Sequence, residues 1–374
     1  MTFQIALSGI SAATSDLNAT ANNIANVNTT GFKQSRAEFA DMFANSSYGV
    51  AATATGIGVR TSRIAQQFTQ GPINTTGNAL DLAISGEGFF TLSDNGATVY
   101  SRAGAFGTDK DGYVVNASAQ KLQVFPPVDN GTFDTARTVD LQISTSTNPP
   151  SATTNVEANI NLPATATAPL TAPFDPNDAT SYNHTTAVTI YDSLGAAHQQ
   201  TMYFVKSATA NTWDVQVQID GLAAGSGTIT YSDTGTLLTP ANGDIALPAF
   251  TPTNGSAVMN LTVNVSDTTQ YGDAFSINNL AQDGYATGRL TTVEITAEGV
   301  VQARYTNGQA TPLGQIALAR FPNAQGLQQL GDTSWGATFA AGQPIAGTAG
   351  SSNFGAIQPG ALEGSNVDMT AQLV

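Results

Sequence analysis

The segment Trp213-Asp-Val-Gln-Val-Gln-Ile219, followed by Asp220-Gly221, decides the fold class of this 374-residue chain. Its large apolar residues alternate with polar ones, and a period of two places them on one face of a β-strand. The Asp-Gly pair favours a tight hairpin turn, because both residues tolerate the positive φ that such turns require. The segment therefore predicts a half-buried strand after which the chain reverses.

The same pattern recurs along much of the chain. The stretches Leu80-Asp-Leu-Ala-Ile84 and Phe89-Phe-Thr-Leu92 are strand-like, and residues 188–190 and 202–204 flank a turn at Asp192-Ser-Leu-Gly195. Further tight turns are expected at the Asn-Gly and Asp-Gly pairs. These pairs begin at Asn95, Asn130, Asn242, Asn254, Asn307, Asp111, Asp220 and Asp283. We therefore predict a mainly β, multidomain fold.

The composition excludes several classes of function. Twelve Lys and Arg residues stand against 27 Asp and Glu, for a net charge of −15. A protein that binds nucleic acid needs clustered cations to displace counterions from phosphates, and no such cluster is found. The chain has 0 Cys, which rules out disulfides and thiolate metal sites. It also lacks a signal-peptide pattern and any run of about 18 apolar residues, so we expect no membrane insertion.

The N-terminal residues follow a different period. Large and small apolar residues recur at alternating spacings of four and three positions, with Thr14 as the polar exception, which predicts a helix with an apolar stripe. The stripe consists of Phe3, Leu7, Ile10, Leu17, Ala21 and Ile24. This helix is either an ordinary core helix or one that is completed by other helices, of the same chain or of other subunits. Because a lone amphipathic helix is marginal, we expect residues 1–30 to be disordered in an isolated monomer.

Composition also divides the chain into nested segments. Residues 144–173 are rich in Thr, Ala, Asn and Pro, and from residue 145 to Gln282 Lys206 is the only basic residue, against ten acidic ones. We expect an acidic β domain inserted into a larger one. The predicted segments are a terminal helical segment of 1–30 with 356–374, a linker or extended region at 31–70, an intermediate β domain of 71–144 with 284–355, and an inserted outer β domain at 145–283.

The C-terminal residues carry a helix start signal. Ser365-Asn-Val-Asp368 resembles an N-cap followed by an acidic residue in the first helical turn. The sequence ends soon afterwards, at Val374. We therefore expect a C-terminal helix that is cut short, a partner for the N-terminal stripe.

Candidate catalytic and ligand-binding residues are few. His184 and His198 have no Cys or acidic cluster beside them in the sequence, so neither is expected to have partners for a metal site or a triad. Asp109-Lys-Asp-Gly112 begins like a calcium loop but lacks the remaining ligands, which favours a hairpin turn. Gly86-Glu-Gly88 lacks the third glycine of a dinucleotide-binding loop. We expect no catalytic, cofactor-binding or metal-binding residues and no enzymatic activity.

Several stretches resemble one protein family. Asn22-Asn-Ile-Ala-Asn26, followed by Thr29-Thr-Gly-Phe-Lys33, resembles the N-terminal signature of flagellar axial proteins of the rod and hook family. Asn residues suit the end of a helix, and Gly31 permits a sharp reversal before Phe32. The signature residues are Asn22, Asn23, Ile24, Ala25, Asn26, Gly31, Phe32 and Lys33. Further stretches that resemble the family are 39–43, 76–90, 100–106, 313–321, 347–351 and 362–368.

The resemblance implies a structural subunit rather than an enzyme. The insert at 145–283 favours the hook proteins of this family, which self-assemble as homopolymers into a flexible tube that serves as a universal joint between rod and filament. The implied partners are other copies of the chain, rod and hook–filament junction proteins, the hook cap and the flagellar type III export apparatus. The implied location is extracellular, reached without a cleaved signal peptide. The alternatives are a distal rod protein or a β-rich extracellular adhesin, which would not need the N-terminal stripe.

Overall fold

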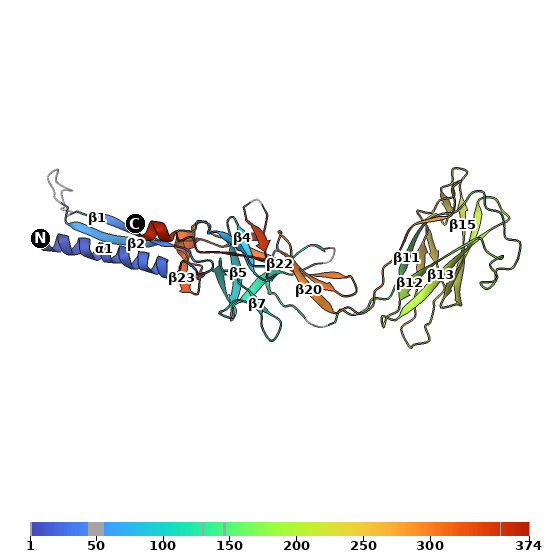
Figure 1. Ribbon diagram of the computed structural model, residues 1–374, viewed down its shortest axis with the longest axis horizontal. Coiled ribbons are helices and arrows are strands. Elements are labelled where there is room, and N and C mark those ends of the chain that lie inside the picture. The colour runs from blue at the N-terminus through green and yellow to red at the C-terminus, as the bar shows by residue number, and fades with distance from the viewer. Residues whose placement is uncertain (1, 44–55, 129–130, 145–146, 352, 374) are drawn as a thin grey trace. The chain divides into compact units, whose positions relative to one another are not determined.

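A computed structural model describes residues 2–43, 56–128, 131–144, 147–351 and 353–373. The chain forms two compact units, coloured along the sequence in Figure 1. Unit 1 comprises Met1–Thr145, Thr291–Arg304 and Ala310–Val374, and unit 2 comprises Ser146–Leu290 with Tyr305–Gln309. The predicted fold class is confirmed, because strands dominate both units and unit 2 is inserted between segments of unit 1.

Unit 1 joins segments from both ends of the chain. Its main sheet has the strand order β20-β21-β22-β9-β5-β6-β24-β23, and β25 also pairs with β22. Two small sheets, β26–β4 and β27–β3, pair C-terminal strands with strands near residues 73–85. The elements of unit 1 are α1 (Thr2–Ala25), β1 (Ser35–Met42), β2 (Gly58–Gln66), β3 (Ile73–Thr75), β4 (Leu82–Ser85), β5 (Phe89–Asp94), β6 (Ala97–Ser101), β7 (Gly107–Thr108), β8 (Val114–Val115), β9 (Lys121–Phe125), β10 (Val139–Asp140), β20 (Leu290–Ile295), β21 (Val300–Tyr305), β22 (Ala310–Arg320), β23 (Gln328–Gly331), β24 (Ser334–Gly336), β25 (Ile345–Thr348), β26 (Ala356–Pro359), β27 (Ala361–Glu363) and α2 (Met369–Leu373).

Aromatic side chains fill part of the core of unit 1. Phe89 makes edge-to-face contacts with Phe68, Phe321 and Trp335, at ring-centroid distances of 5.5, 6.2 and 5.7 Å. Such T-shaped pairs add to the free energy of apolar burial, because the positive edge of one ring meets the negative face of the other. Phe68 follows β2 and Phe89 is the first residue of β5. The cluster therefore attaches β5 of the main sheet to the segment that follows β2.

Unit 2 is a sandwich of two sheets. One sheet has the order β12-β13-β14-β15-β16 and the other β17-β18-β11-β19. Apolar residues of both sheets share one core, in which Trp213 is fully buried and its indole Nε1 donates a hydrogen bond to Gln270 Oε1 at 2.9 Å. The strands of unit 2 are β11 (Asn155–Asn161), β12 (His184–Tyr191), β13 (Ala197–Lys206), β14 (Thr212–Ile219), β15 (Leu222–Tyr231), β16 (Leu237–Thr239), β17 (Asp244–Ala246), β18 (Thr262–Asn264) and β19 (Ser276–Gln282).

The predicted strands and turns of unit 2 are present. Trp213, Val215, Val217 and Ile219 on β14 are all buried, and β12 and β13 form the hairpin expected around residues 192–195. The turn pairs vary more than expected. Both residues have positive φ at Asn95-Gly96 and at Asp220-Gly221, as a type I′ turn requires. At Asn242, Asn254, Asn307 and Asp111 the first residue keeps negative φ, so those turns are of other types. The turn expected at Asp283-Gly284 is wrong, because the backbone there is bonded to the segment 151–155. Asn130 lies outside the described residues.

The N-terminal helix is formed in the single chain, which corrects our expectation of disorder. α1 lies along the antiparallel pair of β1 and β2, a pair that occupies much of the stretch 31–70 expected as a linker or extended region (Figure 1). Small side chains allow the close approach: Ala12 and Ala19 on the helix and Ala65 on β2 are buried. The helix therefore has cover on one face, which the sequence pattern did not reveal. None of the described helices is long and apolar enough to cross a membrane.

The C-terminal helix α2 begins one turn later than predicted. The carboxylate of Asp368 caps it, because Asp368 Oδ1 accepts hydrogen bonds from the backbone N–H of Thr370 at 2.9 Å and of Ala371 at 3.3 Å. These bonds lower the pKa of Asp368, with the bond from the Thr370 hydroxyl as the largest cause. The expected cap at Ser365 and Asn366 is wrong, since Asn366 bonds to other segments of unit 1.

Candidate functional site: an uncovered helix face and its anchor

The helix α1 has two opposite faces of different character. Residues toward β1 and β2 are small or polar, except for Ile5; they are buried or half-buried and recur every three or four positions. They are Ile5, Ser8, Ala12, Ser15, Ala19 and Asn23. The predicted stripe lies on the other face, where the exposed fractions are 79% for Phe3, 51% for Leu7, 64% for Ile10 and 68% for Leu17. Ala21 is also exposed and Ile24 is half-buried.

The uncovered face, Phe3 to Ile24, leaves apolar surface in contact with water in a single chain, which is unfavourable. Burial of one large apolar side chain stabilises a structure by roughly 1.5–3 kcal/mol, and within the chain these side chains collect little of it. Contiguous exposed apolar patches on soluble proteins mark surfaces that bind another macromolecule. A groove beside this face, lined by Leu7, Ser11 and Ser15 of α1 and Arg60 of β2, offers space for a further element.

The end of α1 is fixed by the amide of Asn23. Asn23 is buried, its Nδ2 donates to the carbonyl oxygen of Ser35 at 2.8 Å, and its Oδ1 accepts from the Ser35 N–H at 2.8 Å. Nδ2 also donates to Gln372 Oε1 at 3.3 Å, which ties α1 to α2. Asn23 thus pairs with the first residue of β1 as a neighbouring strand would, so its place in the signature has a physical reason.

Gly31 allows the turn after α1 to approach the β domain closely. Its φ is +70°, and a Cβ at this position would lie 2.4 Å from the backbone nitrogen of Ala103. The Gly31 N–H donates to the carbonyl oxygen of Glu363 at 2.8 Å, so the turn is bonded to β27. Phe32 is buried beside it. Any residue other than Gly would force the turn away from the β domain.

A buried ionic cluster lies directly behind this turn. Lys33 Nζ donates to Glu363 Oε1 at 2.6 Å and to the carbonyl oxygen of Thr69 at 2.7 Å, and the side chains of Lys33 and Glu363 are fully buried. Glu363 Oε1 also accepts from the N–H of Gly71 at 2.9 Å, and Oε2 lies 3.4 Å from Arg102 Nη1. The cluster joins the N-terminal turn, the C-terminal strand β27 and the β domain at one point.

Burial acts on both cations of this cluster. It lowers the pKa of the Lys33 amine, and Glu363 offsets part of that effect; burial likewise lowers the pKa of the Arg102 guanidinium. Ions taken out of water are costly unless they are paired and hydrogen-bonded. Here Glu363 Oε1 is hydrogen-bonded, whereas Oε2 has only the ion pair with Arg102 at 3.4 Å. The arrangement is therefore sensitive to the loss of any one partner, which suits an anchor rather than a catalytic group.

A second amide clamp completes the anchor. Asn366 Oδ1 accepts from the N–H of Gln34 at 2.7 Å, and Asn366 Nδ2 donates to the carbonyl oxygens of Gln67 at 2.7 Å and Thr69 at 3.1 Å. It holds the start of β1 and the end of β2, which lie side by side, to the C-terminal segment. Sequence reasoning missed the roles of Asn366, Glu363 and Arg102, although all three lie in stretches that resemble the family.

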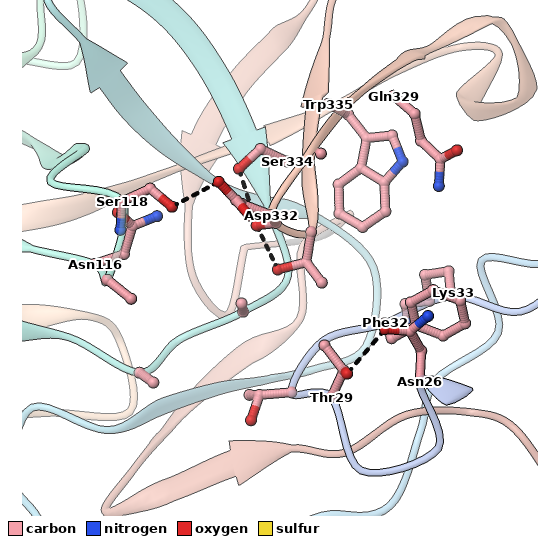
Figure 2. A pocket seen from close by; sticks show the side chains of 16 residues that line it. Asn26, Thr29, Phe32, Lys33, Asn116, Ser118, Gln329, Asp332, Ser334 and Trp335 are labelled. Atoms are coloured by element: carbon pink, nitrogen blue, oxygen red, sulfur yellow. Dashed lines mark hydrogen bonds between the residues drawn. The ribbon is translucent and has the colours of Figure 1, made fainter. Parts of the chain in front are cut away.

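A cavity of about 450 Å³ lies between the signature turn and the β domain, as Figure 2 shows. Thr29 Oγ1 donates to Asn26 Oδ1 at 3.1 Å on one side, and Ser118 Oγ donates to Asp332 Oδ2 at 3.0 Å on the other. Trp335 forms part of the lining, and its Nε1 donates to Gln66 Oε1 at 2.6 Å. Two more labelled side chains bond to Gln120: Asn116 Nδ2 donates to Gln120 Oε1 at 2.8 Å, and Ser334 Oγ donates to the same oxygen at 3.1 Å.

The structure corrects one expectation about histidine. His198, expected to have no partners, lies between Asp192 and Asp220, with N···O distances of 3.3 and 2.6 Å. His184 instead stacks on Phe275, with ring centroids 4.3 Å apart. Among the described residues, no three His, Cys, Asp or Glu side chains are arranged to hold a metal ion. The Asp109 carboxylate accepts from the N–H groups of Asp111 and Tyr113, so it forms a turn.

Comparison with known proteins identifies the chain's relatives. Residues 83–171 match the flagellar hook protein FlgE/F/G D1 domain, residues 161–285 the flagellar basal body protein FlaE D2 domain, and residues 3–33 the flagella basal body rod protein family. The flagellar hook protein FlgE of Escherichia coli (strain K12) is 38% identical over 100% of this chain and 92% of its own length. That of Salmonella typhimurium is also 38% identical, over 100% of this chain and 93% of its own length.

A solved structure supports the same fold. The crystal structure of Helicobacter pylori flagellar hook protein FlgE2 covers 78% of this chain and 100% of its own chain, with a TM-score of 0.58 at 16% identity. Relatives that match the full length carry the hook protein name, so neither a distal rod protein nor an adhesin is favoured. The chain therefore belongs to the flagellar hook protein family, FlgE.

Proposed function

We propose that this hook protein self-assembles through the uncovered face of α1, which packs against helices of other copies of the chain. The observation that carries the proposal is the pair of opposite faces on one helix. β1 and β2 cover the face of Ala12 and Ala19, while Phe3, Ile10 and Leu17 remain exposed. A homopolymer covers such a face in every subunit, and the buried apolar area then stabilises the tube.

The anchor behind the signature turn gives the assembly a stiff connection. A subunit of a torque-carrying tube must pass force from its helical segment to its β domain. Lys33, Glu363 and Arg102 lock these parts together with short, buried contacts, and Asn23 and Asn366 add amide clamps. We infer that bending of the tube takes place between subunits rather than at this point.

We propose that the inserted domain, residues 145–283, forms the outer layer of the tube, and that 71–144 with 284–355 form its body. Ten acidic residues against Lys206 up to Gln282 would repel each other in a confined inner layer. On the outside, solvent and salt screen them beyond about 8–10 Å. Their charge then helps to keep the polymer soluble.

We infer that the chain contacts rod and hook–filament junction proteins, the hook cap and the flagellar type III export apparatus, and that it acts outside the cell without a cleaved signal peptide. A chain with 0 Cys suits export in an unfolded state, because no disulfide loop can obstruct threading. The role is structural and needs neither an active site nor a cofactor.

The test compares two neighbouring positions on α1 in the otherwise unchanged protein. Leu17→Asp places a carboxylate on the uncovered face, and Asn18→Asp places one beside it, on an exposed position outside the stripe. A charge buried in a helix seam without a partner costs several kcal/mol at each contact. We expect Asn18→Asp to form tubes in electron micrographs and Leu17→Asp to remain monomeric by sedimentation, with equal thermal unfolding. Tubes of Leu17→Asp at wild-type concentration would contradict the proposal.

A further inference from the structure

Three connections meet at one end of the sandwich in unit 2. They are the β12–β13 turn at residues 192–196, the β14–β15 turn at Asp220-Gly221, and the loop at 253–258. The backbone N–H of Ala257 in this loop donates to Ser193 Oγ at 2.8 Å, and Asn254 Nδ2 donates to the carboxylate of Asp192. Two of these connections belong to one sheet and the third precedes a strand of the other, so contacts here join the two sheets.

His198 lies at the centre of this junction. Its side chain is 11% exposed, Nδ1 lies 2.6 Å from Asp220 Oδ2, and Nε2 lies 3.3 Å from Asp192 Oδ2. Asp192 is fully buried, and its Oδ1 accepts from the N–H groups of Leu194 at 2.9 Å and Ala196 at 2.8 Å. The other oxygen of Asp220 accepts from the N–H of Gln199 at 2.9 Å. Backbone N–H groups thus bind one oxygen of each carboxylate, and the ring lies between the two remaining oxygens, of which Asp192 Oδ2 also accepts from Asn254 Nδ2.

This geometry selects the protonated ring. A neutral imidazole has one N–H donor and one acceptor nitrogen, whereas an imidazolium donates from both. Ionised carboxylates only accept, so in the neutral state one ring nitrogen would turn its lone pair toward Asp192 or Asp220. Among the described residues these two are the charged groups that face the ring, and the 253–258 loop contributes the neutral amide of Asn254.

We propose that His198 is a pH-sensitive clamp, which holds the three connections together while it is protonated and releases the 253–258 loop when it loses its proton. Asp192 Oδ2 faces the ring and also accepts from Asn254 Nδ2, so a change in the ring's charge acts on this bond. Ser193 of the same turn accepts from the N–H of Ala257. The connections carry the exposed aliphatic side chains of Leu194, Leu222 and Val258. The clamp therefore sets the relative positions of these side chains at the end of the domain.

The direction of the pH dependence follows from the shifted pKa values. Burial lowers the pKa of His198, but hydrogen bonds to Asp220 and Asp192 raise it by more, so it lies above the usual value of about 6.5. The stabilisation is therefore fully present below about pH 6.5 and is lost as the pH rises through the raised pKa. Burial raises the pKa of Asp192, but the hydrogen bonds from Asn254, Ala196 and His198 lower it by more, so the net shift is downward. The stabilisation that the Asp192 carboxylate contributes is therefore lost only in strong acid.

Two histidines allow an internally controlled titration of the full chain by NMR. We expect the His198 ring to titrate above about pH 6.5 and the His184 ring below it, because burial lowers the pKa of His184. His184→Gln assigns the two signals. Asp220→Asn removes one charged partner and is expected to shift the His198 midpoint downward. A His198 midpoint at or below the usual value, or one that does not move in Asp220→Asn, would overturn the proposal.

Hydrogen exchange then tests the release of the loop. After correction for the intrinsic exchange rate, we expect the Ala257 N–H to lose protection between pH 6 and pH 9, because the ring loses its proton within this range. In His198→Gln, protection should be low at both values. The N–H of Val215 in the core strand β14 serves as the control and should keep its protection. Equal protection of Ala257 at both pH values in the unaltered protein would refute the clamp.

Discussion

The helix α1 and the β-sandwich of unit 2 use apolar residues in opposite ways. In unit 2 the largest apolar side chains, such as Trp213 and Phe204, are fully buried between two sheets of the same chain. On α1 the buried apolar residues are alanines, while Phe3 remains 79% exposed. One region completes its core alone, and the other leaves its large side chains exposed. The difference is the one expected if unit 2 folds by itself and α1 serves assembly, as we propose.

The two regions also differ in the interactions that stabilise them. Burial of apolar area stabilises a fold by about 25 cal/mol per Å², so unit 2 gains its stability within the chain. The contact of α1 with β1 and β2 rests on small side chains and on hydrogen bonds such as that from the Val59 N–H to Ser8 Oγ at 3.2 Å. Such a contact orients the helix without using its stripe. The stripe then remains available for assembly.

The first way to break the comparison is to open the core of unit 2. Trp213→Ala leaves a large cavity and removes the bond to Gln270, and we expect a loss of about 3–5 kcal/mol in the stability of unit 2. Chemical denaturation followed by hydrogen exchange should show early unfolding of unit 2 with α1 unchanged. Leu222→Ala, at an exposed position in the same unit, is the control and should change stability by about 0.5 kcal/mol or less. Simultaneous loss of α1 would show that the two regions are not independent.

The second way is to weaken the anchor that holds α1 to the β domain. Lys33→Met keeps the length of the side chain but leaves the buried Glu363 with Arg102 alone, at 3.4 Å. We expect unit 1 to lose about 3 kcal/mol, because removal of one partner leaves an undercompensated buried charge. Lys110→Met breaks an exposed pair with Asp111 and should cost at most about 1 kcal/mol. Thermal unfolding of both variants checks this, and equal effects would refute a special role for the buried pair.

The third way sharpens the distinction between the two faces of α1. Ala12 is buried against the hairpin and Ala13 is exposed. We expect Ala12→Leu to push the helix from β2 and to cost about 1–3 kcal/mol, as overpacking does. Ala13→Leu should be close to neutral. Hydrogen exchange across α1 and β2 distinguishes them, and equal protection in the two variants would mean that this face does not pack as described.

Much of the fold could be predicted from local patterns. The strand from Trp213 to Ile219 and the hairpin around Asp192 were predicted from patterns within a few consecutive residues. Both are present, with the expected faces buried. The N-terminal stripe likewise predicted α1. The cover on its other face escaped prediction, because Ser8, Ala12 and Ala19 carry no apolar period of their own and acquire a role only when β1 and β2 lie beside them.

The residues of the candidate site were likewise predictable only in part. The signature residues were recognisable one after another in the sequence, but their partners are distant. Glu363 lies 330 positions from Lys33 along the chain, and Asn366 lies 332 positions from Gln34. The error over His198 has the same origin, since Asp220 reaches the ring only through the pairing of β13 with β14.

By itself the sequence determined where strands, turns and the apolar stripe occur, because these depend on the period of polar and apolar residues along a short stretch. It also determined the class of function, through the residues of the N-terminal signature. Only the tertiary structure decided which face of α1 is covered, which charges are buried together and which state of His198 is stable. Those properties depend on burial and on distances of a few ångströms between residues that are far apart in the chain, and no local pattern contains them.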